Sequence, residues 1–580
     1  MKRNLERLVL DALSTLQQDG VLSIDDLPAV QLERTRDVKH GDFACNIAMV
    51  LAAASKLKPR DIAAKIAAAI PDSDLVGKIE VAGPGFINFF LKPGAFQNIP
   101  KEILDAGEAY GRSDYGQGRR IVVEFVSANP TGPLHIGHGR GAAYGAALAN
   151  LLEAIGFTVQ REYYVNDAGR QTGILALSVW LRYLEKCGED IVFPPNAYQG
   201  EYIKEIAATL YERDGKSLCH SADAVMGVIT PDMGVEAQLD RLMEQAGRLI
   251  GKNAFRKVTD LAVQIILEDI RDDLAAFGVE FDTWFYEHEL VDSKAVDQVI
   301  NRLGEHIYEK GGARWFSAKK FHDEKDRVVI RENGQPTYFA LDTAYHLNKL
   351  ERGIDRIIDV WGADHHGYVP RLKAAIAAMG EGPDKLDVLL IQFVSLYRGG
   401  KKVQMSTRAG EFVTLRELRE EVGCDAARFF YVLRKSDQHL DFDLDLAKSQ
   451  SSDNPVYYVQ YAHARICSVM KQMDQKHLKW DAEEGAGNLS LLTEQHEQAL
   501  LATLFRYPEV IESAAQGEEP HQLAYYLRDL ANDFHTYYNT HQFLVESSPL
   551  RNARISLILA TRQVLHNGLS LLGVSAPEVM

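Results

Sequence analysis

The sequence predicts an α/β protein built around a doubly wound parallel sheet, with an α+β domain before it and an all-α domain after it. From residue 119 onward, short apolar runs alternate with helical stretches, which is the pattern of βαβ units. The residues before this region mix helical and strand-like patterns, and those after about 450 carry helical periodicity alone. A chain of 580 residues is too long for one hydrophobic core. We therefore expect domains at 1–110, 111–450 and 451–580.

The first domain should be a compact α+β unit. Apolar residues recur at helical spacing over 5–17 and 43–69, and strand-like runs follow at 78–81 and 85–91. Charged residues interrupt the first of these stretches, so it is predicted to be an amphipathic helix and not a signal peptide.

The central domain should hold a Rossmann-type parallel sheet. Residues 120–126 form an apolar run suited to a central strand, and an Ala- and Leu-rich helix follows at 139–155. Residues 185–290 are mostly helical and are predicted to be an insertion in the sheet. Ligands of such sheets bind beyond the carboxyl ends of the strands. Further strands are expected at 158–165, 355–360 and 388–396.

The last domain is predicted to be a helical bundle. Its helices are expected at 455–475, 492–515, 520–540 and 551–571.

Composition is that of a soluble globular protein, with 46% hydrophobic and 25% charged residues. No apolar run approaches the roughly 18 residues that a membrane span needs, so we expect a cytoplasmic protein without membrane contact. The five scattered cysteines indicate reduced thiols and argue against a structural zinc site. A net charge of −17 does not predict nucleic-acid binding, although a local basic groove remains compatible with it. We expect a monomer.

The segment that follows the first parallel strand is predicted to bind phosphate. Pro130, Gly132 and Pro133 force an abrupt turn, and His135 and His138 then bracket the start of the next helix. Free backbone N–H groups and the helix dipole favour an anion there. The two imidazoles, three residues apart, can donate hydrogen bonds to phosphate oxygens. For an isolated pair of this kind, helix capping and metal binding are the alternatives.

A second segment that could take part in phosphate chemistry is the loop at 398–410. Two glycines should make it mobile, and Lys401, Lys402 and Arg408 could neutralise charge on a leaving pyrophosphate. Between the two segments lies Trp361-Gly-Ala-Asp-His-His366, at the end of a predicted strand. A zinc site is the competing interpretation of its Asp-His-His, but no fourth ligand lies nearby at metal-site spacing.

The string Ser127-Ala-Asn-Pro-Thr-Gly-Pro-Leu-His-Ile-Gly-His138 closely resembles the HIGH signature of class I aminoacyl-tRNA synthetases. The flanking Glu124-Phe and Ser127-x-Asn129 resemble the arginyl branch of that class, and residues 1–110 resemble its additional amino-terminal domain, which touches the tRNA. The 398–410 loop is similar to the KMSKS loop, with Met405 and Ser406 matching and Gln404 and Thr407 in place of the lysines. Many arginyl enzymes compensate with a lysine just before HIGH, but here that position is Gly132. Arg408 or Lys402 must then take the role, or bound tRNA must organise the loop.

The resemblance implies functional residues at matching positions. Tyr338 and Asp342, one turn apart on a predicted helix, resemble the pair whose aspartate reads the guanidinium. Gly137 would leave space for a flat base. The catalytic set implied is His135, Gly137, His138, Lys402, Met405, Ser406 and Arg408. The arginine set is Glu124, Ser127, Asn129, His135, Tyr338 and Asp342. The ATP set is His135, His138, Gly362, Asp364, His365, His366 and Met405. The tRNA set is Tyr458, Tyr461 and Met580.

These residues lead to one functional hypothesis. The chain would activate L-arginine with ATP, release pyrophosphate and transfer arginine to the 3′-terminal adenosine of tRNA(Arg). ATP would act with Mg²⁺, although no residue set identifies a dedicated metal site and no zinc is expected. Another class I aminoacyl-tRNA synthetase is the alternative, followed by a catalytically silent RNA-binding relative and by a nucleotidyltransferase of HIGH type.

Overall fold

The structure, a computed structural model, describes residues 2–22, 27–35, 38–55, 57–73, 75–92, 94–230, 232–403 and 413–580. The chain divides into two compact units. The first comprises Met1–Tyr110, Ser468–Glu509 and Asn532–Val564, and the second comprises Gly111–Cys467, Val510–Ala531 and Leu565–Met580.

The amino-terminal part of the first unit is a four-stranded antiparallel sheet in the order β1-β2-β4-β3, packed with helices around one apolar core. The predicted helix at 43–69 is wrong at its start, because Phe43 and Cys45 alternate with Ala44 in burial and form a strand. The elements are α1 (Lys2–Gln18), β1 (Leu32–Arg34), β2 (Phe43–Cys45), α2 (Ile47–Ser55), α3 (Pro59–Ala69), β3 (Val76–Ala82), β4 (Phe86–Leu91) and α4 (Ile99–Ala106).

The second unit is centred on a five-stranded parallel sheet in the order β12-β11-β5-β6-β7. Its faces are covered on both sides, since α5 packs on one and α13 and α14 share a core with strands β5 and β11 on the other. The predicted doubly wound sheet is confirmed. The elements are β5 (Arg120–Glu124), α5 (Ile136–Ala154), β6 (Thr158–Val165), β7 (Thr283–Tyr286), β11 (Arg356–Gly362), β12 (Leu386–Ile391), α13 (Tyr338–Glu351) and α14 (Val369–Ala378).

Two sequence predictions about this sheet need correction. The expected strand at 388–396 is two strands, β12 and β13 (Val394–Arg398), which belong to different sheets. They separate at Gln392, whose backbone N–H leaves the ladder and donates to the carbonyl of Ser436 at 2.9 Å. The predicted helical insertion at 185–290 contains β7, the edge strand of the parallel sheet. Its four residues are too few to stand out within a helical region.

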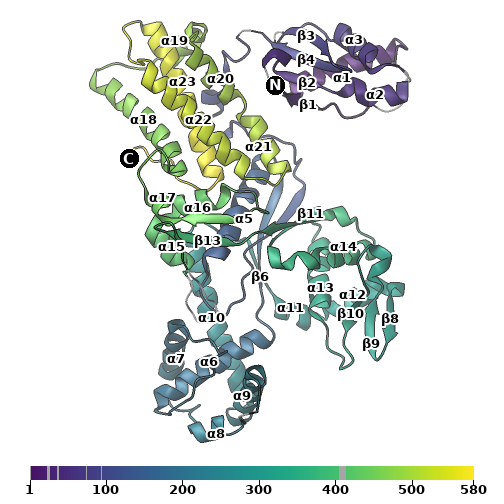
Figure 1. The fold of residues 1–580 in the computed structure, drawn as a ribbon, viewed down its shortest axis with the longest axis vertical. Coiled ribbons are helices and arrows are strands. Elements are labelled where there is room, and N and C mark those ends of the chain that lie inside the picture. The colour runs from purple at the N-terminus through teal and green to yellow at the C-terminus, as the bar shows by residue number, and fades with distance from the viewer. Residues whose placement is uncertain are drawn as a thin grey trace. The chain divides into compact units, whose positions relative to one another are not determined.

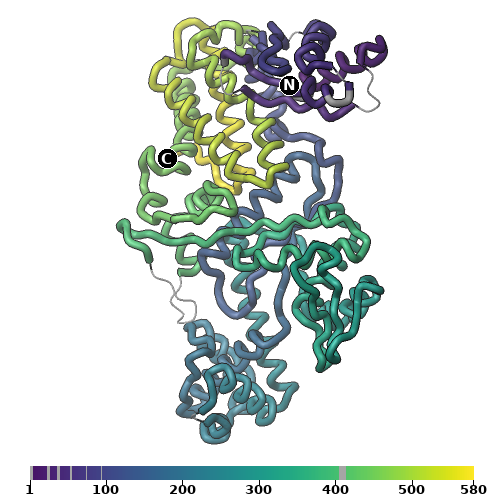
Figure 2. Tube along the Cα trace, turned by 45° about the vertical axis from the view of Figure 1, so that its right-hand side comes forward, coloured from purple at the N-terminus to yellow at the C-terminus, as the bar shows by residue number. Residues whose placement is uncertain are grey.

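The inserted helices gather into a cluster of their own, which Figures 1 and 2 both show apart from the helices of residues 287–378. They are α6 (Arg170–Cys187), α7 (Glu201–Asp214), α8 (Ala222–Met226), α9 (Val235–Leu249) and α10 (Lys252–Ala276). Because α6 and α7 pack together, Cys187 comes within 6.3 Å of Cys219 (Cα to Cα) and the two form a disulfide. The expectation of five reduced thiols is therefore wrong for this pair, which stands 32 residues apart in the sequence.

Smaller elements complete the second unit. One sheet is antiparallel with the order β10-β9-β8, and a mixed sheet has the order β14-β13-β15, in which β13 is antiparallel to β14 and parallel to β15. The bounds are α11 (Glu287–Asp292), α12 (Ala295–Leu303), β8 (Ile307–Lys310), β9 (Ala313–Phe316), β10 (Arg327–Ile330), β14 (Lys401–Lys402), α15 (Leu415–Val422), α16 (Cys424–Val432), β15 (Leu440–Asp443) and α17 (Leu444–Lys448).

The remaining helices follow the predicted periodicity closely, and their residues are divided between the two units. The stretch predicted as one helix at 492–515 is two helices that separate at Arg506. Within the described residues, none of the helices combines the length and the apolar character that crossing a bilayer requires. The helices are α18 (Pro455–Gln475), α19 (Ala482–Gly487), α20 (Gln495–Phe505), α21 (Tyr507–Gln516), α22 (His521–Thr540) and α23 (Ser548–Leu571).

Candidate active site

The candidate site lies where the winding of the parallel sheet reverses. From β5 the chain adds β6 and β7 on one side and then crosses to add β11 and β12 on the other. The carboxyl ends of β5 and β11 therefore border a crevice, which is where ligands of such sheets bind. Two adjoining cavities open there.

The first cavity, here the Asp342 cavity, has a volume of about 300 Å³. The second, here the His135 cavity, has a volume of about 400 Å³. They share a wall, so ligands in the two would lie side by side. The shared wall consists of Val126, Ser127, Asn129, Val360, Trp361, Gly362 and His365.

The two histidines of the signature cap helix α5 reciprocally. His135 Nδ1 accepts from the backbone N–H of Gly137 at 3.1 Å, and His138 Nδ1 accepts from the backbone N–H of His135 at 3.3 Å. The rings stack with centroids 3.7 Å apart. Burial lowers the pKa of His138 to about 3 and also lowers that of His135. Both rings are neutral at pH 7, and because Nδ1 accepts, the proton of each lies on Nε2.

This geometry changes the interpretation of the histidine signature. In the sequence, helix capping and phosphate contact were alternatives. The structure makes them compatible, because Nδ1 of each ring caps the helix while Nε2–H can still donate, and both histidines line the His135 cavity. Gly137 also lines it, and a Cβ at this position would lie 2.9 Å from His135 Cε1. Gly137 thus makes room for the His135 ring, a role that the sequence did not indicate.

The turn after β5 has an unusual backbone. Val126 and Ser127 have φ angles of 67° and 39°, in the left-handed region that non-glycine residues rarely adopt. The Ser127 hydroxyl holds this turn by donating to Glu124 at 2.9 Å and accepting from the backbone N–H of Tyr164 at 3.1 Å. The turn places Ser127 and Asn129 in the shared wall of the cavities.

Beneath the Asp342 cavity lies a buried charge network that the sequence did not predict. The Lys349 ammonium donates to Glu124 at 2.6 Å and to Asp359 at 2.9 Å. His346 faces Asp359 at 2.8 Å through Nε2 and the carbonyl of Asp342 at 2.7 Å through Nδ1. The network brings the Lys349 ammonium and the His346 ring against the carboxyl groups of Glu124 and Asp359.

The charges in this network fix each other. Burial alone would raise the pKa of Asp359, but Lys349 and His346 outweigh it and lower the pKa to about 2. Burial opposes the charge of Lys349, and the surrounding carboxylates nevertheless raise its pKa. Glu124 lines the Asp342 cavity and pairs with Lys349; burial raises its pKa, and Lys349 opposes that rise.

Asp342 is different because its carboxylate has no hydrogen bond or ion pair with any described residue. Burial raises its pKa to about 7; the nearby His346 opposes this rise, and Glu124 and Glu287 add to it. Glu287 is itself buried and accepts from the hydroxyl of Tyr164, which lines the same cavity. A cationic ligand in the Asp342 cavity would favour the ionised form of these carboxyl groups. Tyr338, one turn before Asp342, lines the cavity entrance and is 58% exposed.

The predicted adenosine segment lies at the end of β11 and in the 3-10 helix after it. Gly362 and His365 line both cavities, and Asp364 lines the His135 cavity. His366 lines neither; its ring faces the carbonyl of Ala363 at 3.2 Å. Within the described residues, there is no group of three or more His, Cys, Asp or Glu side chains that could hold a metal ion.

Only the start of the predicted 398–410 loop is described. Residues 397–402 form a hairpin in which Tyr397 pairs with Lys402, and Gly399 and Gly400 make its turn with φ angles of 57° and 71°. These glycines therefore serve a tight turn, where a mobile loop was expected. Lys402 is exposed in β14 and lines neither cavity. Met405, Ser406 and Arg408 lie outside the described residues.

The predicted tRNA contacts lie on or near the first turns of α18. Tyr458 and Tyr461 are half-buried, and Tyr461 stacks between Tyr457, at 5.8 Å between ring centroids, and the guanidinium of Arg465, at 4.4 Å. The chain end approaches the same helix, since the carbonyl of Pro577 lies 2.9 Å from His463 Nδ1. Met580 is 46% exposed.

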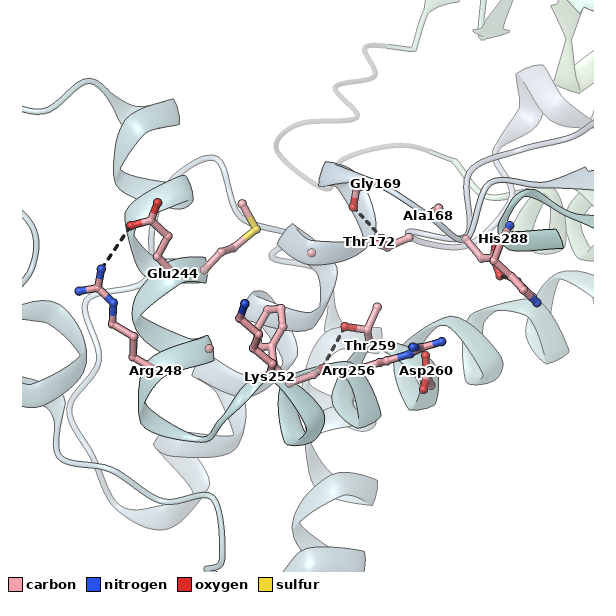
Figure 3. A pocket seen from close by; sticks show the side chains of 15 residues that line it. Ala168, Gly169, Thr172, Glu244, Arg248, Lys252, Arg256, Thr259, Asp260 and His288 are labelled. Carbon is pink, nitrogen blue, oxygen red and sulfur yellow. Dashed lines mark hydrogen bonds and ion pairs between the residues drawn. The ribbon is translucent and has the colours of Figure 1, made fainter. Parts of the chain in front are cut away.

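A third cavity, of about 850 Å³, lies between α6, α9, α10 and the start of α11 (Figure 3). It adjoins the Asp342 cavity, because consecutive residues line the two: Asn166 lines the Asp342 cavity, and Asp167 lines the third cavity. Its lining mixes three carboxylates with three cations, so it has no net preference for an anion. These are Asp167, Glu244, Asp260, Arg248, Lys252 and Arg256.

Sequence reasoning missed several residues of the site. His346 and Lys349 lie one and two turns after Asp342 on α13, and Asp359 stands between the apolar residues of β11. Helical spacing from Asp342 and a carboxylate inside a buried strand were the available signals. Tyr164, Asn166, Tyr345 and Trp361 also line the Asp342 cavity.

The fold and the two cavities at the switch point define a class I aminoacyl-tRNA synthetase. Residues 100–439 match the family described as tRNA synthetases class I (R), catalytic domain. Residues 3–91 match the arginyl tRNA synthetase N terminal domain, and residues 459–580 match the DALR anticodon binding domain.

Similar proteins specify the branch. The arginine–tRNA ligase of Thioalkalivibrio sulfidiphilus is 61% identical, and that of Legionella pneumophila strain Paris is 55% identical, each over the whole of both chains. The solved Thermus thermophilus arginyl-tRNA synthetase shares the fold, with a TM-score of 0.74 at 23% identity over the whole of both chains. The chain belongs to the arginyl-tRNA synthetase family.

Proposed function

We propose that this protein activates L-arginine with ATP and transfers the arginyl group to the 3′-terminal adenosine of tRNA(Arg). The observation that carries the proposal is the Asp342 cavity. Lys349 and His346 pair with Glu124 and Asp359, whereas the Asp342 carboxyl group has no hydrogen bond or ion pair with a described residue and is available to a cationic ligand. A planar guanidinium can pair with it through two parallel hydrogen bonds, which an ammonium cannot do.

ATP is assigned to the adjoining His135 cavity. The Nε2–H groups of His135 and His138 are the donors for phosphate oxygens, and Asp364 and His365 are placed for the adenosine. Neutral imidazoles suit this task because they donate hydrogen bonds at every pH near neutrality. The arginine carboxylate would attack the α-phosphate across the wall that the cavities share, and pyrophosphate would leave.

Magnesium would enter with ATP. Mg²⁺ is commonly bound by substrate phosphates and one or two carboxylates, and Asp364 is the carboxylate in the lining of the His135 cavity. The ion would neutralise phosphate charge as pyrophosphate leaves.

We further assign the anticodon to the face of α18 that carries Tyr458 and Tyr461, with Met580 beside it. Unstacked bases bind to aromatic rings and arginine planes, and Tyr457, Tyr461 and Arg465 form such a stack. A monomer in the cytoplasm is the state that we propose for this function.

The test is ATP–pyrophosphate exchange with each amino acid, with and without tRNA(Arg). Arginine should support exchange, while lysine, cysteine and glutamate should not, because none of them supplies a guanidinium to Asp342. Exchange with another amino acid in place of arginine would refute the assignment and favour another class I synthetase. A strict requirement for tRNA would support the hypothesis that tRNA organises the loop around Met405 and Ser406.

A further inference from the structure

The turn that precedes the histidine signature is held by a side chain of the helical insertion. The Tyr202 hydroxyl, on the first turn of α7, donates to the carbonyl of Thr131 at 2.8 Å. Burial raises the pKa of this phenol, so it stays a donor. Thr131 stands four residues before His135, and the chain between them is the turn that delivers both histidines to the His135 cavity.

The Tyr202 ring occupies space that two glycines leave open. A Cβ at Gly132 would lie 2.9 Å from the Tyr202 hydroxyl oxygen, and a Cβ at Gly200 would lie 2.3 Å from Tyr202 Cε1. Gly200 has φ −58°, and Gly132 is not among the glycines with positive φ, so neither backbone requires glycine. Both glycines are therefore explained by the ring between them.

The segment that carries Tyr202 is itself fixed to α6. The backbone N–H of Tyr198 donates to the buried Ser178 hydroxyl at 3.0 Å, and the Tyr198 hydroxyl donates to Gln171 at 2.5 Å. The Thr131 side chain also hydrogen-bonds to Tyr198. The helical insertion thus contacts the turn through Tyr198 and Tyr202. Hydrogen bonds to α6 hold the segment that carries both tyrosines.

We infer that Tyr202 is a positioning residue for ATP, matched to Gly132, which sets the turn from which His135 and His138 meet the phosphates. The Tyr202 hydroxyl stands where a side chain at position 132 would begin, so a compensating lysine there would require this ring to move. With Tyr202 in place, the cation that assists the leaving pyrophosphate would come from another segment. This inference rests on the proposed function and goes beyond it by giving the insertion a part in the activation step.

The test compares Tyr202→Phe, Tyr202→Ala, Gly132→Ala and the double variant in arginine-dependent ATP–pyrophosphate exchange. Tyr202→Phe removes one hydrogen bond and leaves the ring, so kcat/KM for ATP should fall about tenfold, while the Kd for arginine stays within twofold of wild type. Gly132→Ala should lower kcat/KM for ATP by tenfold or more in wild type, but by less than twofold in the Tyr202→Ala background, where the overlap is gone.

The matched control is Tyr211→Phe on the same helix, since the Tyr211 hydroxyl has no hydrogen bond with the described residues. It should behave as wild type, and melting temperatures should show all single variants folded. Wild-type ATP kinetics in Tyr202→Phe, or an equal effect of Gly132→Ala in both backgrounds, would overturn the inference. A wild-type enzyme without any arginine-dependent exchange would instead refute the proposed function, so the two failures are distinguishable.

Discussion

Replacement of Asp342 by Asn tests the central claim about the Asp342 cavity. The pKa of Asp342 is raised to about 7 in the unliganded protein, and a guanidinium binds only its ionised form. Below pH 7, binding must therefore first remove a proton. For a pKa of 7, linkage makes the Kd for arginine about tenfold weaker at pH 6 than at pH 8.

The assay is isothermal titration of arginine at pH 6, 7 and 8. Asp342→Asn should weaken binding by about 10²-fold or more, because it removes one partner of a buried charge pair, and the pH dependence should disappear with it. Glu351→Gln, an exposed position on the same helix, is the control and should keep the wild-type slope. Equal Kd values at pH 6 and pH 8 in wild type would show that Asp342 is not the group that reads the guanidinium.

Asp342→Asn should also change the stability of the unliganded protein. A carboxylate whose pKa is raised on folding is held protonated in the native state while the unfolded chain has released its proton, so stability falls as pH rises from about 4 to about 7. Asp342→Asn removes this cost, which is at most about 4 kcal/mol at pH 8. The variant should melt above wild type at pH 8 and close to it at pH 4, and a higher melting temperature for wild type at pH 8 would contradict the reasoning.

Three further predictions concern packing, the buried network and tRNA. Gly145→Ala should destabilise the protein by about 1–3 kcal/mol, because a Cβ there would lie 2.3 Å from the Phe125 ring, whereas Gly141→Ala on the same helix meets nothing within 4 Å and should be neutral or stabilising in urea unfolding. Lys349→Met should cost about 3–5 kcal/mol in the same assay, because it leaves the buried Glu124 without its cation and Asp359 with His346 alone. Tyr461→Ala should weaken tRNA(Arg) binding by about tenfold in a filter-binding assay, because it removes a stacking surface.

Two controls separate these effects from general damage. Lys216→Met, at an exposed lysine of the insertion, should leave stability unchanged, and Tyr115→Ala, at an exposed tyrosine outside α18, should leave tRNA affinity unchanged. Equal stability of Lys349→Met and wild type would mean that the buried network is not held together by that ammonium.

Local features of the site were readable from the sequence. The strand, turn and helix around His135 lie within about twenty consecutive residues, so their propensities and their geometry belong to one short segment. Tyr338 and Asp342 are one turn apart on a helix, and helical spacing alone places them on one face. The parallel sheet, with its ligands beyond the carboxyl ends of the strands, followed from the alternation of strands and helices, whereas the strand order that places the switch point came from the structure.

Only the tertiary structure showed which charged groups are paired and which positions lie against other side chains. Glu124 was expected to face the ligand, but Lys349, 225 residues away, pairs with it, and the carboxyl group without a hydrogen bond or ion pair among the described residues is that of Asp342. In the sequence, Gly132 stood out because many arginyl enzymes carry a lysine at this position. The structure gives a reason for the glycine, because a Cβ there would lie 2.9 Å from the hydroxyl oxygen of Tyr202 in the helical insertion. Periodicity reports the backbone near each residue, whereas charge balance and steric exclusion depend on which distant side chains fold into contact.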